Sequence, residues 1–183
     1  AASCRFRPLG RFTTTAKVEL MATDYLIRVD GEVQRPRQFA FEDLLAIGDA
    51  YQIDDVSQWA PRYEGKAVQL AGLLAAARIK PTAMYLGLHA SQDDFHASIP
   101  LDAVRDQGIV IYSLDGRYAL PVDAGGPARF YIRDHVACNV DDIDECANVK
   151  FLDHIELTVE RGFDNRPEDE EEHARLHREQ EED

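Results

Sequence analysis

Apolar and polar residues alternate along much of the chain with the period of two that is typical of β-strands. Residues 24–33 show this pattern at Tyr25, Ile27 and Val29, and the dipeptide Asp30-Gly31 follows. We therefore predict a strand that enters a hairpin. Residues 95–100 alternate in the same way, and we predict a buried strand over residues 82–90, further strands within residues 50–56, 125–134 and 151–160, and a hairpin of two apolar arms over residues 109–121 around Asp115-Gly116.

Helical periodicity is confined to short segments. Residues 39–48 predict an amphipathic helix that ends at Gly48, and residues 101–106 predict one helical turn. Residues 68–79 predict a helix that stops before Pro81. Its apolar face is formed by Val68, Leu70, Leu73, Leu74 and Ala77. Strands dominate, so the predicted fold class is α+β, mostly β, with short helices between the strands.

The two ends of the chain differ from its middle in charge. Residues 1–20 carry four basic residues and one acid, which predicts a flexible leader, an upstream mis-assigned start before Met21, or a targeting segment. Residues 168–183 carry nine acids and two arginines, a net charge of −7 out of −14 for the chain. We predict one domain over residues 21–162 and an acidic tail over residues 163–183, solvated or acting as a docking segment.

Composition excludes two classes of function. The net charge of −14 argues against nucleic-acid binding, which needs a basic face. No apolar run approaches the ~18 residues of a membrane helix, so no membrane partner is expected. Three cysteines in 183 residues are too few for a disulfide framework, which fits a reducing compartment such as the cytoplasm.

One short stretch raises a question of chemistry. Asp54 and Asp55 lie between an apolar run and Trp59, the chain's single tryptophan. Asp55 is either a strand-end acid that caps the next turn, or an oxygen ligand to a metal, or the remnant of a ligand site. General acid–base work lacks an indicated partner.

An ordered set of motifs resembles the molybdopterin-binding domain of the sulfite oxidase family. The stretches that carry the resemblance are FHASIPLDAV (95–104), YSLDGRYALPVDAGGPARFYI (112–132) and NVKFLDHIEL (148–157). In that family the corresponding segments read like Tyr-Gly-Ala-Ser-Ile-Pro, a strand–turn–Leu-Pro hairpin, His-Gly-x-Pro-x-Arg and Val-Lys-Trp-Leu. The resemblance implies the family's fold and a molybdopterin cofactor.

The resemblance also implies which functional groups have changed. The family's metal-binding cysteine lies four residues before a tryptophan, which places Asp55 at that position relative to Trp59. The family's active-site tyrosine corresponds to Phe95, its histidine to Ala124, and its Lys-Trp pair to Lys150 and Phe151. The soft thiolate and the hydroxyl would then both be missing.

Other positions keep the family's pattern. Ser91, Arg129 and Lys150 remain as candidate cofactor contacts, because the family uses this region to hold the pterin and its phosphate and arginine suits phosphate. Ion pairs with neighbouring acids are the alternative for Arg129 and Lys150. His89 and His96 fit hydrogen-bonded structural residues better than ligands, and His96 stands where the family has glycine.

Residues 133–150 form an insertion that the resemblance does not explain. It contains His135, Cys138 and Cys146 among five acids. Three interpretations stay open: a loop with two free thiols, a disulfide between the cysteines, or a bound metal such as zinc with His135 or an aspartate. Cys-x7-Cys is not a standard zinc spacing.

These observations lead to a functional hypothesis with alternatives. The leading one is a degenerate molybdopterin-binding-domain protein that acts as a binding or partner domain, with an unidentified protein as its partner. The second is an active molybdenum oxidoreductase with Asp55 at the metal. The third is a protein stabilised by a metal or disulfide in the loop of Cys138 and Cys146.

Overall fold

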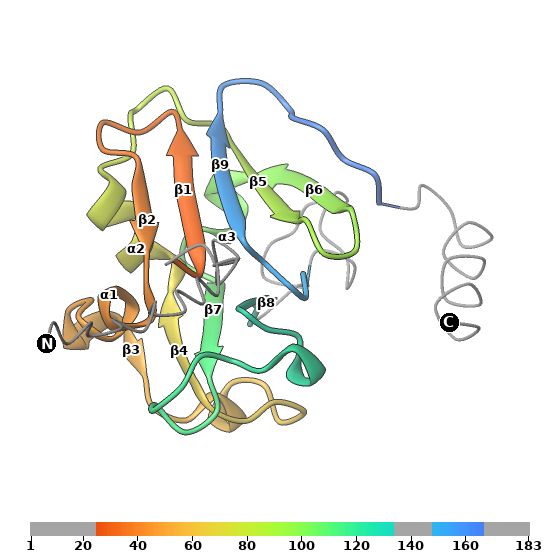
Figure 1. Ribbon diagram of the computed structural model, residues 1–183. Helices are drawn as coiled ribbons and strands as arrows, with labels where there is room; N and C mark the ends of the chain where they lie inside the picture. Colours follow the sequence, from red (N-terminus) through yellow and green to blue (C-terminus); the bar gives the residue numbers. More distant parts are fainter. Residues whose placement is uncertain (1–24, 134–147, 167–183) are drawn as a thin grey trace, which may run out of the picture.

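The computed structural model describes residues 25–133 and 148–166. Its described part contains two β-sheets and a few short helices, which confirms the predicted α+β class. The strands of the first sheet, in spatial order, are β2 (Arg37–Phe39), β1 (Ile27–Gly31), β9 (His154–Thr158), β5 (Tyr85–Ala90) and β6 (Phe95–Pro100). Those of the second are β3 (Gln52–Ile53), β4 (Lys66–Gln69), β7 (Gly108–Ser113) and β8 (Arg129–Ile132). Figure 1 shows the first sheet above and the second below.

Helices fill the connections between strands. The α-helices are α1 (Phe41–Leu45), α2 (Leu70–Ala77) and α3 (Leu101–Val104), and the 3₁₀ turns are η1 (Asp49–Tyr51), η2 (Val56–Gln58) and η3 (Val122–Ala124). Among the described residues, no helix is long and apolar enough to cross a membrane.

One face of the five-stranded sheet lies on the main core. Alternate residues point inward from each strand, for example Leu86 and Leu88 of β5 and Ile155 and Leu157 of β9. The polar positions between them point to the outer face. The alternation predicted for β1 and β6 therefore has its expected cause, because a half-buried strand buries every second residue.

The four-stranded sheet is covered on both faces, and β7 is buried at every position. One face joins the main core through Val68, Val110 and Phe130. The other face packs on a smaller core of Ile53, Val56, Ala60, Ala67, Ile109, Ile111 and Leu120. A strand buried on both faces has no alternation, which explains the continuous apolar run at residues 109–112.

Three predicted elements need correction. The strand expected at residues 50–56 is reduced to Gln52–Ile53 between two 3₁₀ turns. The helix expected from Val68 begins at Leu70, because Val68 pairs with Gln52 and Val110 in the middle of the second sheet. An apolar residue of a doubly buried strand is indistinguishable in sequence from one on a helix face.

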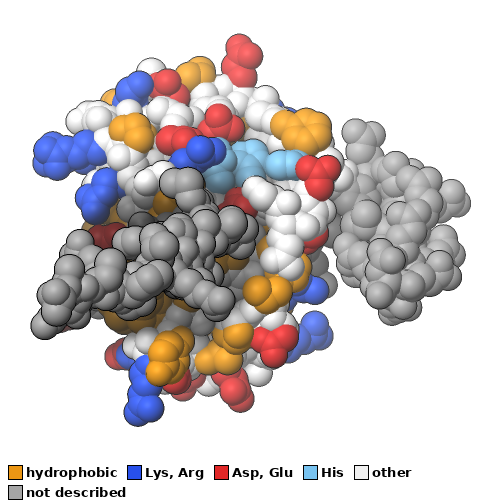
Figure 2. Space-filling view, viewed as in Figure 1, with side chains coloured by type: hydrophobic (Ala, Val, Ile, Leu, Met, Phe, Trp, Pro, Cys, Tyr) orange, Lys and Arg blue, Asp and Glu red, His pale blue; other side chains and the backbone are white. Residues whose placement is uncertain are grey.

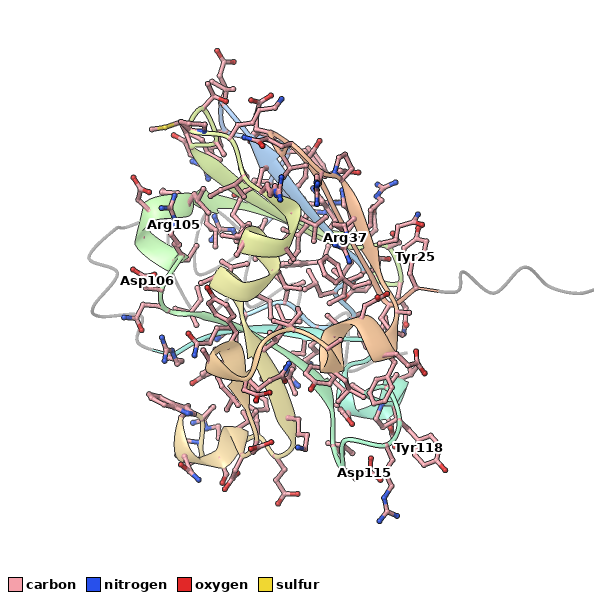
Figure 3. All side chains as sticks on the ribbon, turned by 90° about the vertical axis from the view of Figure 1, so that its left-hand side faces the viewer. Tyr25, Arg37, Arg105, Asp106, Asp115 and Tyr118 are labelled. Atoms are coloured by element: carbon pink, nitrogen blue, oxygen red, sulfur yellow. The ribbon has the colours of Figure 1, made fainter. Side chains whose placement is uncertain are left out.

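The hairpin predicted over residues 109–121 has only its first arm as a strand. The return segment forms one backbone hydrogen bond to that strand, from Leu120 N to Tyr112 O, and the place beside β7 belongs to β8. Instead, Ser113 Oγ holds the turn by donating to Tyr118 O and accepting from Gly116 N. Figure 3 shows Asp115 and Tyr118 at the outer tip of this loop, pointing away from the molecule.

Residues after β9 lie along the edge strand β6. Gly162 N donates to Ser98 Oγ at 2.9 Å, and Asn165 N donates to His96 O at 3.0 Å. The side chains of Asp164 and Asn165 accept hydrogen bonds from the β6 amides of Ser98 and His96. We call residues 159–166 the edge segment. It covers a strand edge that would otherwise expose unpaired backbone groups.

Candidate functional site

Asp55 lies two residues after the end of β3 and serves as the N-cap of η2. Its carboxylate accepts hydrogen bonds from the backbone N and the hydroxyl of Ser57, at 3.0 and 2.6 Å, and from Gln58 Nε2 at 3.4 Å. The side-chain and backbone hydrogen bonds of Ser57 lower the pKa of Asp55. A fixed, ionised cap is the arrangement expected of an Asx residue at a helix start.

The neighbouring acid is used separately. Asp54 pairs with Lys66 Nζ at 2.6 Å, and its side chain is 85% exposed. The two carboxylates therefore do not share one ligand or one proton. Their different partners argue against a catalytic acid pair.

A second group of residues converges where the two sheets meet. Residues 149–152 run beside the start of β8, with hydrogen bonds from Phe130 N to Val149 O, Phe151 N to Gly125 O and Leu152 N to Ala128 O. Asp153 N then reaches His89 O at the end of β5. This segment therefore brings Lys150 next to Arg129 and to the β5–β6 turn. We call Gly125, Arg129, Lys150 and Tyr63 the cradle.

Gly125 sets the shape of the cradle. It has φ of +89°, a left-handed conformation that glycine adopts without strain. A Cβ at this position would lie 3.5 Å from Arg129 Nη1 and 3.6 Å from Lys150 Cβ. Both cationic residues therefore border the same glycine backbone.

Arg129 is positioned by an aromatic residue. Its guanidinium carbon lies 4.3 Å from the centre of the Tyr63 ring, and its Nη2 donates to the Tyr63 hydroxyl at 3.1 Å. Its Nε is buried and has no hydrogen-bond partner among the described residues. Buried nitrogen donors normally have partners, so an unsatisfied Nε beside a second cation suits an anionic group.

Carboxylates border the cradle on the side of the β5–β6 turn. Ser91 N donates to Asp153 Oδ2 at 3.1 Å, whereas Asp153 Oδ1 is buried and lacks a partner within the described residues. The pKa of Asp93 is raised, mainly because its carboxyl group is partly buried, although the residue as a whole is exposed. The positive charge of Lys150 acts in the opposite direction and lowers this pKa. Within the described part, Arg129 and Lys150 form no ion pair with these acids.

Phe95 and His96 project from opposite faces of β6, as strand alternation predicts. Phe95 packs against the main core, whereas the His96 ring lies against His89 on the outer face with ring centroids 5.0 Å apart.

The remaining predicted ligands, His135, Cys138 and Cys146, lie outside the described residues. Within residues 25–133 and 148–166, no group of three or more His, Cys, Asp or Glu side chains could hold a metal ion. The interpretations of the loop that contains these residues stay predictions.

The sequence analysis missed one cluster. His89, His96 and His154 occupy neighbouring positions on three adjacent strands. Burial lowers the pKa of His89, and the neighbouring His154 and His96 rings lower it further. The signal was present in the β5–β6 hairpin, because residues 89 and 96 are equidistant from its turn.

Comparison with known proteins places these features in a family. Residues 13–165 match the family model described as the oxidoreductase molybdopterin-binding domain. A solved structure with the same fold is that of the sulfane dehydrogenase SoxCD from Paracoccus pantotrophus, with a TM-score of 0.55 and 22% sequence identity. The match covers 75% of this chain and 39% of that one, so this chain spans about two-fifths of its length. A search of curated proteins finds no match. Since the family match covers most of the sequence, the chain belongs to the oxidoreductase molybdopterin-binding domain family.

Proposed function

We propose that this protein is a binding domain of its family that keeps the anion-holding cradle but does not carry out molybdenum redox chemistry. The observation that carries the proposal is that the Asp55 carboxylate is already hydrogen-bonded within its own turn. The family resemblance puts the metal thiolate at this position, and here a carboxylate occupies it whose oxygens already accept three hydrogen bonds within one turn.

The donor set around Asp55 does not suit an oxo-molybdenum centre. The family's ligand is a soft thiolate, whereas a carboxylate is a hard oxygen ligand. Binding a metal through Asp55 would also break the cap that begins η2. No redox step at molybdenum is therefore assigned to this chain.

The cradle fits the phosphate-bearing arm of a pterin cofactor. Arg129 offers a buried, unpartnered Nε, and Lys150 is exposed beside it. Gly125 lies buried between them and borders both side chains. Charge-assisted hydrogen bonds to phosphate are the strong contacts expected of such a group. The cradle would thus hold a phosphate, and an active oxidoreductase with Asp55 at the metal is the alternative that the experiment must exclude.

Metal and pterin contents of the purified protein test the proposal. The full chain is produced in a host that makes molybdopterin, and molybdenum is measured by elemental analysis and pterin by fluorescence. We expect molybdenum well below one per chain, with measurable pterin. Arg129→Ala should lower the pterin content about tenfold or more, because a hydrogen bond to a charged group contributes roughly 1.5–3 kcal/mol.

Two variants make the result decisive. Arg62→Ala is the matched control, because Arg62 is exposed in the loop that carries Tyr63 and should leave pterin content unchanged. Asp55→Cys restores the family's thiolate and should raise the molybdenum content. One molybdenum and one pterin per wild-type chain, both lost in Asp55→Ala, would refute the degenerate assignment. Equal pterin in the Arg129 and Arg62 variants would refute the cradle.

A further inference from the structure

Four polar side chains form a row across the outer face of the five-stranded sheet. Arg28 of β1 pairs with His154 of β9, His154 with His89 of β5, and His89 with His96 of β6. Figure 2 shows the histidines as a continuous pale blue band on this face, with a basic side chain at one end and an acidic one at the other. None of these residues belongs to the cradle.

The hydrogen bonds of His154 are complete. Its Nδ1 lies 3.1 Å from Arg28 Nη2, which can only donate, so Nδ1 must accept. Its Nε2 lies 2.7 Å from Asp30 Oδ1 and must donate. His154 is therefore satisfied as a neutral ring with its proton on Nε2.

His89 and His96 form a direct hydrogen bond. Their Nδ1 atoms lie 2.8 Å apart, so one ring donates and the other accepts. The opposite nitrogen of each ring faces a carboxylate. His96 Nε2 lies 3.2 Å from Asp94 Oδ1, and His89 Nε2 lies 3.5 Å from Glu156 Oε2. The two rings and the two carboxylates thus form one chain of polar groups.

The number of protons on the two rings decides whether this arrangement is stable. With two protons, the bond between the Nδ1 atoms uses one, and one Nε2 is left bare beside its carboxylate. With three protons, one is shared between the Nδ1 atoms and each Nε2 can donate to its carboxylate, so every group has a partner. With four protons, two N–H groups point at each other across 2.8 Å and both rings are positively charged. The pair therefore holds together with up to three protons and separates with four.

His96 is the ring that turns away when the pair separates. The His89 ring is enclosed, because its centroid lies 4.9 Å from that of His154 and a Cβ on Gly87 would lie 2.9 Å from its Nε2. The His96 side chain is more exposed and belongs to β6, at the end of the sheet. Its ring packs on Phe163 of the edge segment, with ring centroids 5.0 Å apart.

The edge segment is attached to the same histidine through its backbone. Asn165 N donates to His96 O at 3.0 Å, and His96 N donates to Asn165 Oδ1 at 2.8 Å. Asn165 Nδ2 also donates to Asp94 O at 2.6 Å. A turn of the His96 ring removes the surface on which Phe163 packs. The hydrogen bonds of Asn165 then lose the contact that adjoins them, and the segment detaches more often.

We infer that the His89–His96 pair is a pH-sensitive switch, which holds the edge segment on β6 at neutral pH and loosens it in acid, when both rings are fully protonated. Charged groups surround the pair on each neighbouring element. They are Arg28 and Asp30 of β1, His154 and Glu156 of β9, Asp94 of the β5–β6 turn, and Asp164 of the edge segment with its partners Arg161 and Arg166. The carboxylates of Asp94 and Glu156 act on the Nε2 atoms, whereas the fourth proton adds its repulsion between the Nδ1 atoms.

The direction of the pH dependence follows from the surroundings of His89. Burial lowers the pKa of His89, and the charges of His154 and His96 lower it further, while Glu156 acts in the opposite direction. The closed pair thus takes up its last proton less readily than a separated ring with the ordinary pKa of 6.5. The closed arrangement is complete above that pH and is lost as the pH falls from it toward the lowered pKa. Asp164, whose pKa is about 2, stays ionised while this happens.

Hydrogen exchange of the full chain tests the inference. The protection of the His96 and Asn165 amides is measured by NMR at about pH 7.5 and about pH 5, and corrected for the intrinsic pH dependence of exchange. We expect protection to fall about tenfold or more between the two in the wild type, because each unit of difference in pKa is a factor of ten. The amides of Ile155 and Leu157 in the central strand β9 should keep their protection.

Two variants separate the switch from a general effect of acid. His89→Asn replaces the titrating ring with an amide whose oxygen can accept from His96 Nδ1 and takes up no proton, so protection should stay nearly constant. His154→Gln is the matched control, because it removes a histidine of the same row whose nitrogens are already paired with Arg28 and Asp30. It should respond to pH as the wild type does. Equal losses in the wild type and His89→Asn, or no loss in the wild type, would overturn the switch.

Nitrogen-15 spectra of the histidine rings give a test that needs no variant. At about pH 7.5, the Nδ1 of either His89 or His96 should carry a proton or share one with its neighbour. Bare Nδ1 atoms on both rings, with both protons on Nε2, would also overturn the switch, because no hydrogen bond would then hold the pair together.

Discussion

Asp164 has the most extensive set of hydrogen bonds of any carboxylate in the described residues. It accepts from Arg166 Nη2 at 2.7 Å, Arg161 Nη2 at 3.1 Å and Ser98 N at 3.2 Å. Burial acts to raise its pKa, but the hydrogen bond and charge of Arg166, with the other donors, outweigh it and hold the pKa at about 2, below the ordinary 3.8. A lowered pKa means that the folded state stabilises the ionised form.

The depressed pKa of Asp164 predicts an acid-sensitive contribution to stability. At pH values between about 2 and 3.8, Asp164 is protonated more in the unfolded chain than in the folded one. Its contribution to stability is therefore complete above about pH 5 and is lost as the pH falls through this window. We expect Asp164→Asn to reduce the free energy of unfolding at pH 7 by about 2 kcal/mol, with the difference vanishing toward pH 2. Urea unfolding at a series of pH values measures this.

An exposed ion pair provides the control. Asp102 pairs with Arg105 at 3.5 Å, but its side chain is 86% exposed, so Asp102→Asn should change stability little at any pH. Equal losses in the two variants, or a loss in Asp164→Asn that persists at pH 2, would contradict the role of Asp164.

Sequence reasoning identified Asp55 as a cap or a ligand, but could not choose between them. The choice depends on where Ser57 and Gln58 place their donors, and that is a matter of local backbone geometry. Asp164 was hidden for a different reason. Its partner Ser98 is 66 residues away, and no local sequence pattern predicts a contact between residues so far apart in the chain.

At the scale of elements, the edge segment depends on one buried hydroxyl. Ser98 Oγ accepts the hydrogen bond from Gly162 N, and Ser98 is 1% exposed. We expect Ser98→Ala to lower the free energy of unfolding by roughly 1–2 kcal/mol, because it leaves a backbone donor unsatisfied. Limited trypsin digestion should cut after Arg161 sooner in this variant, since the edge segment would detach more often.

Thr158→Val separates this effect from a general loss of hydroxyl groups. Thr158 Oγ1, at the end of β9, donates to Glu160 O of the edge segment at 2.6 Å, but at an exposed site. Its removal should leave trypsin cleavage near the wild-type rate. Cleavage that is equally fast in both variants would mean that Ser98 does not hold the segment.

The predicted elements were most accurate where one face of a strand is buried. The alternation predicted for β1 and β6 matched the structure because only one face of each strand lies on the main core. Prediction was poorest at β3 and β4, where the second core buries both faces and removes the pattern. The return arm after Asp115 looked like a strand because it is apolar, yet Leu120 faces the second core from a loop.

At the scale of the whole molecule, the acidic tail holds half of the net charge. Removing residues 168–183 changes the net charge from −14 to −7, since they contribute −7. Only Ala174 and Leu176 are apolar in that stretch, too few to stabilise a docked helix against its ordering entropy. We expect the melting temperature to change by less than about 5 °C in a chain that ends at Pro167.

A truncation that removes more residues tests whether the melting-temperature measurement is sensitive. A chain that ends at Arg161 also loses Phe163 and Asp164 with their contacts to β6, and should melt at a clearly lower temperature. A drop of more than about 5 °C in the chain ending at Pro167 would instead show that the tail docks on the domain.

Some residues of the candidate site could be predicted from the sequence and others could not. Arg129 and Lys150 were identified through the resemblance, and the structure brings them to one glycine. Tyr63 was missed, because its contact with Arg129 spans 66 residues and lies outside every quoted motif. The paired histidines were considered singly, since only the register of β5 with β6 shows that they face each other.

The position of β9 bears on how the chain folds as it is synthesised. This strand lies between β1 and β5, yet it is the last of the described strands to be made, and 126 residues separate Arg28 from its neighbour His154. During synthesis, the edges of β1 and β5 that pair with β9 therefore stay unpaired until β9 has been made. Contacts of such long sequence separation slow folding, and open edges invite pairing with other chains. Protection of nascent chains by a chaperone is thus needed most during the interval between the synthesis of β6 and the release of β9.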